Sequence, residues 1–109
     1  MTIERHRDTL RASEIKELHA ANAAAFYEAI KEAITTEPVR HIEIDLSGTA
    51  LLDSCGLGTL VALRKLVDRD CGVVRLLNPT PSAHQMLELT RLYRVLKVVK
   101  CEEVAATAS

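Results

Sequence analysis

The sequence predicts an α/β domain in which helices pack on a mixed β-sheet with an N-terminal hairpin at its edge. Segments with alternating apolar residues, typical of half-buried strands, take turns with segments whose apolar residues recur at helical spacing. The chain has 109 residues, 48% of them hydrophobic, and no internal repeat or linker. This length suits one compact domain over residues 1–109, with a short polar tail at its C-terminus.

The first third of the chain predicts the hairpin and a long helix. Residues 3–15 are mostly polar and weakly alternating, and Arg7-Asp8 is the expected turn of an edge hairpin. A helix follows over residues 20–36 and ends at Pro38, because the residue before a proline disfavours helical geometry. The apolar stripe of this helix consists of Ala23, Phe26, Ile30, Ala33 and Ile34.

A strand and a second helix are expected in the middle of the chain. In residues 40–46 every second residue is apolar, which is the period of a half-buried strand. A turn at residues 47–49 leads to a helix that begins near Asp53 or Ser54 and runs to about Asp68. We expect Gly72 to close this helix in a left-handed conformation.

The apolar residues of the second helix spread over more than one face. The first sector, which includes Arg64, holds Leu57, Leu60, Val61, Leu63 and Val67. The second sector holds Cys55, Ala62 and Leu66. Only one of these faces can pack on the sheet, so the other either contacts a neighbouring helix or forms an exposed patch for a partner protein.

The last third of the chain predicts a strand, a third helix and a final strand. Residues 73–77 are β-branched and apolar, which suits an interior strand of a partly parallel sheet. A turn at residues 78–81 follows, and a helix begins at about Pro81, where the missing N–H of proline is not needed. This helix carries Ala83, Met86, Leu87 and Leu89. The final strand is expected over residues 95–100.

Composition and charge exclude several classes of function. The net charge is −1, with 14 basic and 15 acidic residues, so no positive field favours nucleic acid. No apolar run approaches the roughly 18 to 20 residues that span a bilayer. Because the N-terminus is also unlike a signal peptide, we expect no membrane insertion and a cytoplasmic location. The three cysteines lack a C-x-x-C motif and are expected to be reduced thiols.

Residues 53–58, Asp-Ser-Cys-Gly-Leu-Gly, are the candidate functional segment. They place the Ser54 hydroxyl where a strand leads into a helix. This position fits an ordinary helix cap and also fits a hydroxyl that is switched by phosphorylation, and the two roles are compatible. Gly56 and Gly58 each cost a helix about 1 kcal/mol relative to Ala. That cost indicates close approach by a partner or a neighbouring loop, or tight packing.

A hydrolase is the alternative hypothesis for a serine at such a turn. The nucleophile elbow of hydrolases requires G-x-S-x-G, but Leu52 occupies the position of the first glycine. The four histidines are scattered, and none has a spacing that pairs a base with Ser54. Cys55 is a weak candidate for a reactive thiol at a helix N-terminus. We therefore expect no enzymatic activity, no metal site and no cofactor.

Four segments of the chain carry a resemblance to a known family. They are residues 53–58, the strand at residues 41–46, Asn78-Pro79 and the ending at residues 87–96. Together they resemble the STAS domain, and within it the bacterial anti-sigma factor antagonists, over about residues 10–99. The Asp-Ser-(Ser/Thr)-Gly-Leu-Gly core is the specific part of this resemblance, and the other segments support it.

The resemblance implies a small cytoplasmic switch protein. It would bind an anti-sigma factor that is a Ser/Thr kinase and so release a sigma factor. The kinase would phosphorylate Ser54, and a metal-dependent Ser phosphatase would reverse the reaction. A phosphate adds about −1.5 to −2 charges at a helix N-terminus, which tolerates an anion, so the fold should survive while a docked partner need not. The expected partner-binding residues are Asp53, Cys55, Gly56, Leu57, Gly58, Leu18, His19 and Asn22.

The chain departs from the family pattern at two positions. Family members often carry Gly-Glu-Leu-Asp before the first helix, and the matching residues here are Lys16-Glu17-Leu18-His19. Cys55 stands where a Ser or Thr often follows the phosphorylated Ser. His19 is therefore the substitution expected to make the switch behave unlike its relatives. A second hypothesis keeps the fold but makes the chain a scaffold subunit, without phosphorylation, of a lipid-transport ATPase or a stress-sensing complex.

Overall fold

The computed structural model describes residues 1–68, 72–91 and 96–99. In chain order its elements are β1 (Thr2–His6), β2 (Thr9–Ser13), β3 (Glu17–Leu18), α1 (Ala23–Thr36), β4 (His41–Asp45), β5 (Leu51–Leu52), α2 (Ser54–Asp68), β6 (Val74–Leu77), α3 (Pro81–Thr90) and β7 (Lys97–Val99). The hairpin, the three helices and the strands after each helix are confirmed. The ends of the last predicted strand, at residues 95 and 100, and the polar tail lie outside the described residues. No helix in the described part is long and apolar enough to cross a membrane.

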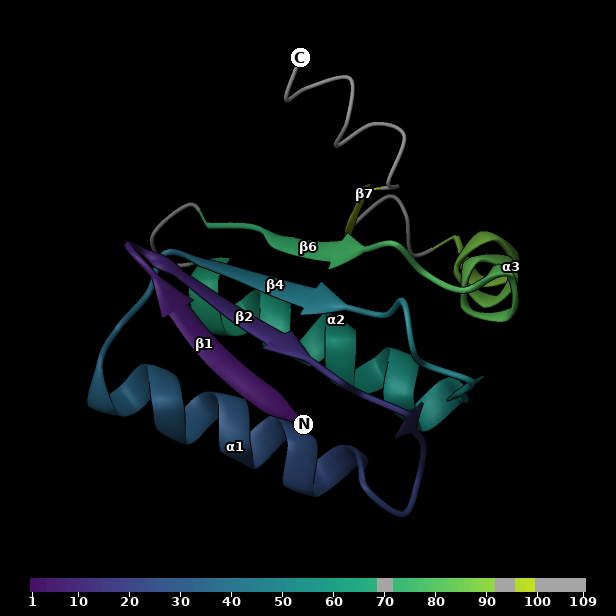
Figure 1. The fold of residues 1–109 in the computed structure, drawn as a ribbon, viewed down its shortest axis with the longest axis horizontal. Helices are drawn as coiled ribbons and strands as arrows, with labels where there is room; N and C mark the ends of the chain where they lie inside the picture. Colours follow the sequence, from purple (N-terminus) through teal and green to yellow (C-terminus); the bar gives the residue numbers. More distant parts are fainter. Residues whose placement is uncertain (69–71, 92–95, 100–109) are drawn as a thin grey trace.

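Five strands form one mixed sheet in the order β1-β2-β4-β6-β7. β1 and β2 form an antiparallel hairpin at one edge, and the remaining neighbours are parallel. The α1 crossover joins β2 to β4, and the α2 crossover joins β4 to β6. Because such crossovers are right-handed and both advance in the same direction, both helices lie on one face. Figure 1 shows α1 and α2 together on one side of the sheet, with α3 beyond the end of β6.

The hydrophobic core lies between the sheet and the helices α1 and α2. The strands contribute Leu10, Ala12, Ile42, Ile44, Val74 and Leu76, which alternate with polar residues. The helices contribute Phe26, Ile30, Leu57, Leu60, Leu63 and Val67. Burying one large apolar side chain contributes about 1.5 to 3 kcal/mol, so this alternation decides which face of each strand turns inward.

The two predicted faces of α2 are buried to different degrees. The first sector is buried apart from half-buried Val61, and Arg64 within it is exposed. In the second sector, half-buried Leu66 packs against the core while Cys55 is exposed. The helix contacts α1 as well as the sheet. Packing against the core therefore accounts for the far end of the second face, but not for its start at Cys55.

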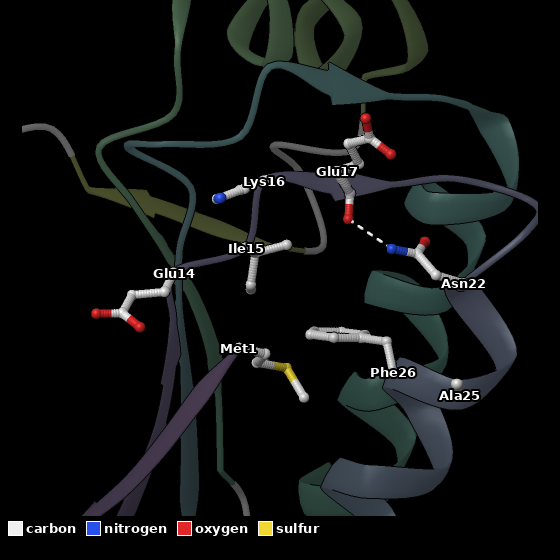
Figure 2. Close-up of a pocket in the computed structure, with 8 residues that line it drawn as sticks. All are labelled: Met1, Glu14, Ile15, Lys16, Glu17, Asn22, Ala25 and Phe26. Atoms are coloured by element: carbon white, nitrogen blue, oxygen red, sulfur yellow. Dashed lines mark hydrogen bonds between the residues drawn. The ribbon is translucent and has the colours of Figure 1, made fainter.

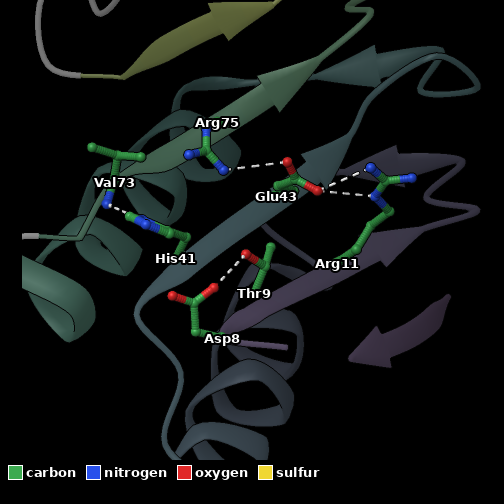
Figure 3. Close-up of polar contacts among 7 residues, drawn as sticks. All are labelled: Asp8, Thr9, Arg11, His41, Glu43, Val73 and Arg75. Atoms are coloured by element: carbon green, nitrogen blue, oxygen red, sulfur yellow. Dashed lines mark hydrogen bonds and ion pairs between the residues drawn. The ribbon is translucent and has the colours of Figure 1, made fainter. Parts of the chain in front are cut away.

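The opposite face of the sheet carries polar residues that pair with one another (Figure 3). Register places Arg11, Glu43 and Arg75 side by side on β2, β4 and β6. Glu43 Oε1 accepts hydrogen bonds from Arg11 Nε and Nη2 at 3.1 and 2.9 Å, and its other oxygen lies 3.4 Å from Arg75 Nη1. The Glu43 side chain is only 17% exposed. These pairs are thus consistent with a face that needs no covering layer.

A second sheet of two short strands was not predicted. β3 and β5 pair in parallel, with Glu17 opposite Leu51 and Leu18 opposite Leu52. Strands of two residues are too short to show an alternating period, so no pattern in the sequence revealed them. This small sheet joins the segment before α1 to the segment before α2. It therefore brings the two parts of the candidate site together.

One expectation for a particular residue differs from the structure. The prediction that Gly72 adopts a left-handed conformation is wrong, because no glycine among the described residues has a positive φ. Instead, a Cβ at Gly72 would collide with the carbonyl oxygen of Arg40, where the chain enters β4. The Gly72 N–H does close the end of α2, because it donates to the carbonyl of Val67 at 2.9 Å. Close backbone approach explains why this residue is a glycine. In α3, Leu89 is 72% exposed, whereas Ala83 and Leu87 are buried.

Candidate functional site

Helix α2 begins at Ser54, and Asp53 caps it. Asp53 Oδ1 accepts a hydrogen bond of 2.9 Å from the N–H of Gly56, while the Asp53 carbonyl accepts the N–H of Leu57 at 2.9 Å. The sequence left the cap open between Asp53 and Ser54, and these bonds assign it to Asp53. Ser54 is exposed, and its hydroxyl makes no hydrogen bond to any residue that the structure describes. The Ser54 hydroxyl is therefore accessible from solvent.

The same carboxylate also ties α2 to the start of α1. Asp53 Oδ2 accepts the N–H of Ala20 at 3.1 Å. The hydrogen bond from Gly56 does most to lower the pKa of Asp53 below its ordinary value. The N–H groups of Ala20 and Cys55 and the charge of His19 lower this pKa further, while desolvation raises it by less than all these groups together lower it. Asp53 is consequently a carboxylate at neutral pH, one residue from the Ser54 hydroxyl.

The β3–β5 sheet positions the segment before α1 against this junction. Beyond the paired strand residues, the N–H of Ala50 donates to Lys16 O at 2.9 Å, and the N–H of Asp53 donates to Leu18 O at 3.3 Å. These two bonds continue the pairing of the two segments beyond the residues of the small sheet itself. Leu18 and Asp53, distant in sequence, thus become neighbours.

Residues 17–22, here called the 17–22 loop, are held by Asn22. Its Nδ2 donates to the Glu17 carbonyl at 2.8 Å (Figure 2), and its Oδ1 accepts the N–H of His19 at 2.8 Å. The N–H groups of Asn22 and Ala23 donate to the carbonyl of His19 at 3.0 and 2.8 Å. The loop is therefore closed by its own polar groups before α1 begins.

The predicted partner-binding residues divide into two groups by burial. Cys55 and Gly58 are exposed, like the predicted phosphoacceptor Ser54, and Asp53, His19 and Asn22 are half-buried. Three others are buried, namely Leu18, Gly56 and Leu57. The structure brings both predicted segments to one edge of the molecule, but the buried residues can affect a partner only by positioning the exposed ones.

Gly56 and Gly58 lie on opposite sides of the helix start. A Cβ at Gly56 would collide with the carbonyl oxygen of Leu18 and would lie 2.9 Å from the Leu52 side chain. At Gly58, apart from its chain neighbours and the backbone of its own helix, no atom of the described residues lies within 4 Å of the position that a Cβ would occupy. The neighbouring loop therefore explains Gly56, while nothing in the described chain explains the helix cost of Gly58.

The sequence analysis missed Leu51 as a candidate contact residue. Its side chain is 48% exposed, and it lies on the short strand β5, three residues before Ser54. Its neighbour Leu52 is buried. Adjacent residues of a strand point to opposite faces, so the exposure of Leu51 follows from β5, which no pattern in the sequence revealed.

A hollow of about 590 Å³ opens beside the 17–22 loop. It is lined by Met1, Glu14, Ile15, Lys16, Glu17, Asn22, Ala25 and Phe26. Figure 2 shows the side chains of Met1, Ile15 and Phe26 converging on this space, while Glu14 and Glu17 point away from it. Asn22, which closes the 17–22 loop, thus also forms part of the wall of this hollow.

Fold and site together define a small α/β domain with an exposed serine at the start of a helix. A family model, the STAS domain, matches residues 2–106. The chain therefore belongs to the STAS domain family, as its sequence suggested.

Two similar proteins are named as anti-sigma factor antagonists. The chain is similar to a protein of Paenibacillus polymyxa named anti-sigma F factor antagonist, with 26% identity over 96% of this chain and 90% of the relative. A crystal structure of an anti-sigma factor antagonist from Mycobacterium paratuberculosis matches with a TM-score of 0.80 and 25% identity, covering 98% of this chain and 90% of that one.

The fold also matches two structures of SpoIIAA. For the unphosphorylated anti-sigma factor antagonist the TM-score is 0.80 at 21% identity, over 98% of this chain and 94% of that chain. For the phosphorylated form, described as a Bacillus cell fate determinant, the TM-score is 0.71 at 21% identity, over 99% and 98%. At this identity the likeness concerns the fold.

Proposed function

We propose that this protein is an anti-sigma factor antagonist of one STAS domain, which binds a Ser/Thr kinase anti-sigma factor in the cytoplasm and so releases a sigma factor. Phosphorylation of Ser54 ends the binding, and a metal-dependent Ser phosphatase restores it. The names of the relatives support the class. The separate roles of Asp53 and Ser54 carry the proposal, because the helix is capped by the former and leaves the hydroxyl of the latter exposed.

The start of α2 suits a residue that is modified without loss of the fold. The first N–H groups of a helix attract an anion, and α2 is 15 residues long. Because the Asp53 carboxylate accepts the N–H of Gly56, the helix keeps its cap when Ser54 carries a phosphate. The modification therefore adds charge at the surface and leaves the core unchanged.

Charge at this position acts on the partner in two ways. The Asp53 carboxylate is one residue away, so a phosphate of about −1.5 to −2 charges concentrates negative charge at the junction. A kinase also presents nucleotide phosphates to the hydroxyl that it modifies, and these repel the phosphorylated product. Both effects weaken the complex after transfer.

Gly58 and Leu51 fit a partner that lies directly on the helix start. Gly58 follows Ser54 by four residues and so shares its side of α2. The open space at Gly58 allows a partner backbone to approach closely, and the exposed Leu51 offers an apolar contact nearby in the chain. Such a partner would explain why the helix keeps a glycine that no contact among the described residues requires.

Incubation with the cognate kinase and ATP, followed by intact mass, tests the proposal. The wild type and Ser47→Ala, which removes another exposed serine, should each gain one phosphate, and Ser54→Ala should gain none. In binding assays Ser54→Ala should keep its affinity for the partner while Ser54→Asp loses it. A wild type that gains no phosphate, together with equal binding by both variants, would favour the scaffold hypothesis.

A further inference from the structure

We propose that His19 is a positioning residue for the 17–22 loop, and that its neutral imidazole holds the loop against Asp53 while its protonated form releases it. This inference rests on the proposed function only for its effect on the partner. The loop geometry itself can be measured in the protein alone.

The hydrogen bonds of His19 define one tautomer. The N–H of Ala21 points to Nδ1 at 3.2 Å, and a backbone N–H can only donate, so Nδ1 must accept. The ring hydrogen of the neutral form then sits on Nε2, which lies 2.9 Å from Glu17 Oε2. Both ring nitrogens are thus engaged when the imidazole is neutral.

The ring is connected to Asp53 through the backbone. His19 and Ala21 flank Ala20, whose N–H donates to Asp53 Oδ2 at 3.1 Å. The His19 N–H is itself held by Asn22 Oδ1. A rotation of the imidazole therefore moves the peptide that reaches the cap of α2.

Protonation strengthens the contact of the ring with carboxylates and removes its acceptor for the Ala21 N–H. The charged groups that face it are the carboxylates of Glu17 on β3 and of Asp53 before α2, and both attract a positive charge on the ring. A hydrogen on Nδ1, however, would point at the N–H of Ala21, and two donors cannot bond. The Glu17 side chain is 56% exposed and can follow the ring outward, whereas the Ala21 N–H belongs to the backbone. The imidazolium consequently keeps its carboxylate and leaves the loop.

The first test uses the free protein. Ring nitrogen shifts should identify His19 as the tautomer with hydrogen on Nε2 near pH 7.5. Amide exchange protection at Ala20 and Ala21 should fall when the pH is lowered from about 8 to about 5. A hydrogen on Nδ1 at neutral pH, or unchanged protection throughout the titration, would overturn the proposal.

Two amide variants provide a matched pair for partner binding. In His19→Asn the amide oxygen can take the position of Nδ1 and accept the Ala21 N–H, while in His19→Gln the amide reaches Glu17 and leaves that N–H without its acceptor. At about pH 7.5, His19→Asn should bind like the wild type and His19→Gln about fivefold more weakly, which corresponds to one hydrogen bond of about 1 kcal/mol.

The pH profile separates positioning from simple structural damage. Wild-type affinity should fall about fivefold toward pH 5.5, and His19→Asn affinity should stay level. A level wild-type profile, or equal affinities of the Asn and Gln variants, would contradict the role of His19. A wild type that neither binds nor is phosphorylated at about pH 7.5 would instead contradict the proposed function, and the exchange measurement would still decide the role of His19.

Discussion

The two glycines at the start of α2, on its inward and outward sides, have different explanations. On the inward side, the carbonyl of Leu18 leaves no room for a Cβ at Gly56. On the outward side, Gly58 faces open space within the described chain, although it weakens the helix. Gly56 is required by the fold, whereas no contact among the described residues requires Gly58, which we propose lies against the partner. The comparison shows how packing and binding requirements can be separated within a single motif.

The largest expected effect is that of Gly56→Ala. The added methyl group would push α2 away from Leu18 and Leu52, and overpacking of this kind costs about 3 kcal/mol. Urea denaturation should show a lower midpoint with partner binding reduced in proportion to the unfolded fraction. A midpoint equal to that of the wild type would mean that the inward side is not tightly packed.

Removal of the cap should have the next largest effect. Asp53→Ala loses the acceptor for Gly56 and the link to Ala20, while Asp53→Asn keeps an acceptor oxygen. The urea midpoint should therefore fall in the order wild type, Asp53→Asn, Asp53→Ala. Equal midpoints for the two variants would show that the acceptor oxygen does not hold the junction together.

Gly58→Ala should change stability and binding in opposite directions. Because no described atom opposes the methyl group, helix propensity should raise the free energy of unfolding by about 1 kcal/mol. The same methyl group should weaken the partner complex, as measured by calorimetry. If both stability and affinity rise, the outward side does not carry a close contact.

The smallest expected effect is the loss at acidic pH of the stability that the ionised Asp53 contributes. The pKa of Asp53 lies below its ordinary value of 3.8, chiefly because Gly56 donates to the carboxylate. Because the pKa of Asp53 is lower in the folded state than in the unfolded state, its ionisation stabilises the fold. This stabilisation is complete at pH values above the unfolded-state pKa and is lost as the pH falls through the folded-state pKa. The stability difference between wild type and Asp53→Asn should shrink from about pH 6 to about pH 3. A constant difference would show that the ionised form has no special role.

The sequence predicted the elements that have a clear period or a local signal. The alternation of residues 40–46 and the apolar stripe of α1 depend on burial on one side, which leaves a regular pattern in the chain. The start of α2 near Asp53 or Ser54 depended on capping chemistry, which is also local.

Features that depend on contacts between distant segments could not be predicted in the same way. The strands β3 and β5 exist only because each pairs with the other. Gly72 is required by the carbonyl of Arg40, more than thirty residues earlier in the chain, so a left-handed conformation was the wrong reason for this glycine. For Leu18 the motif indicated the right place, but its burial followed from the same pairing.

The central claim is that a phosphate on Ser54 controls the partner and leaves the fold intact. The direct measurement is calorimetric titration of the anti-sigma partner with the protein before and after complete phosphorylation, alongside thermal unfolding of both forms. We predict that phosphorylation weakens binding by at least about tenfold, or 1.4 kcal/mol, with similar unfolding temperatures. Equal affinity of the two forms would contradict the account, as would loss of binding that is explained by loss of the fold.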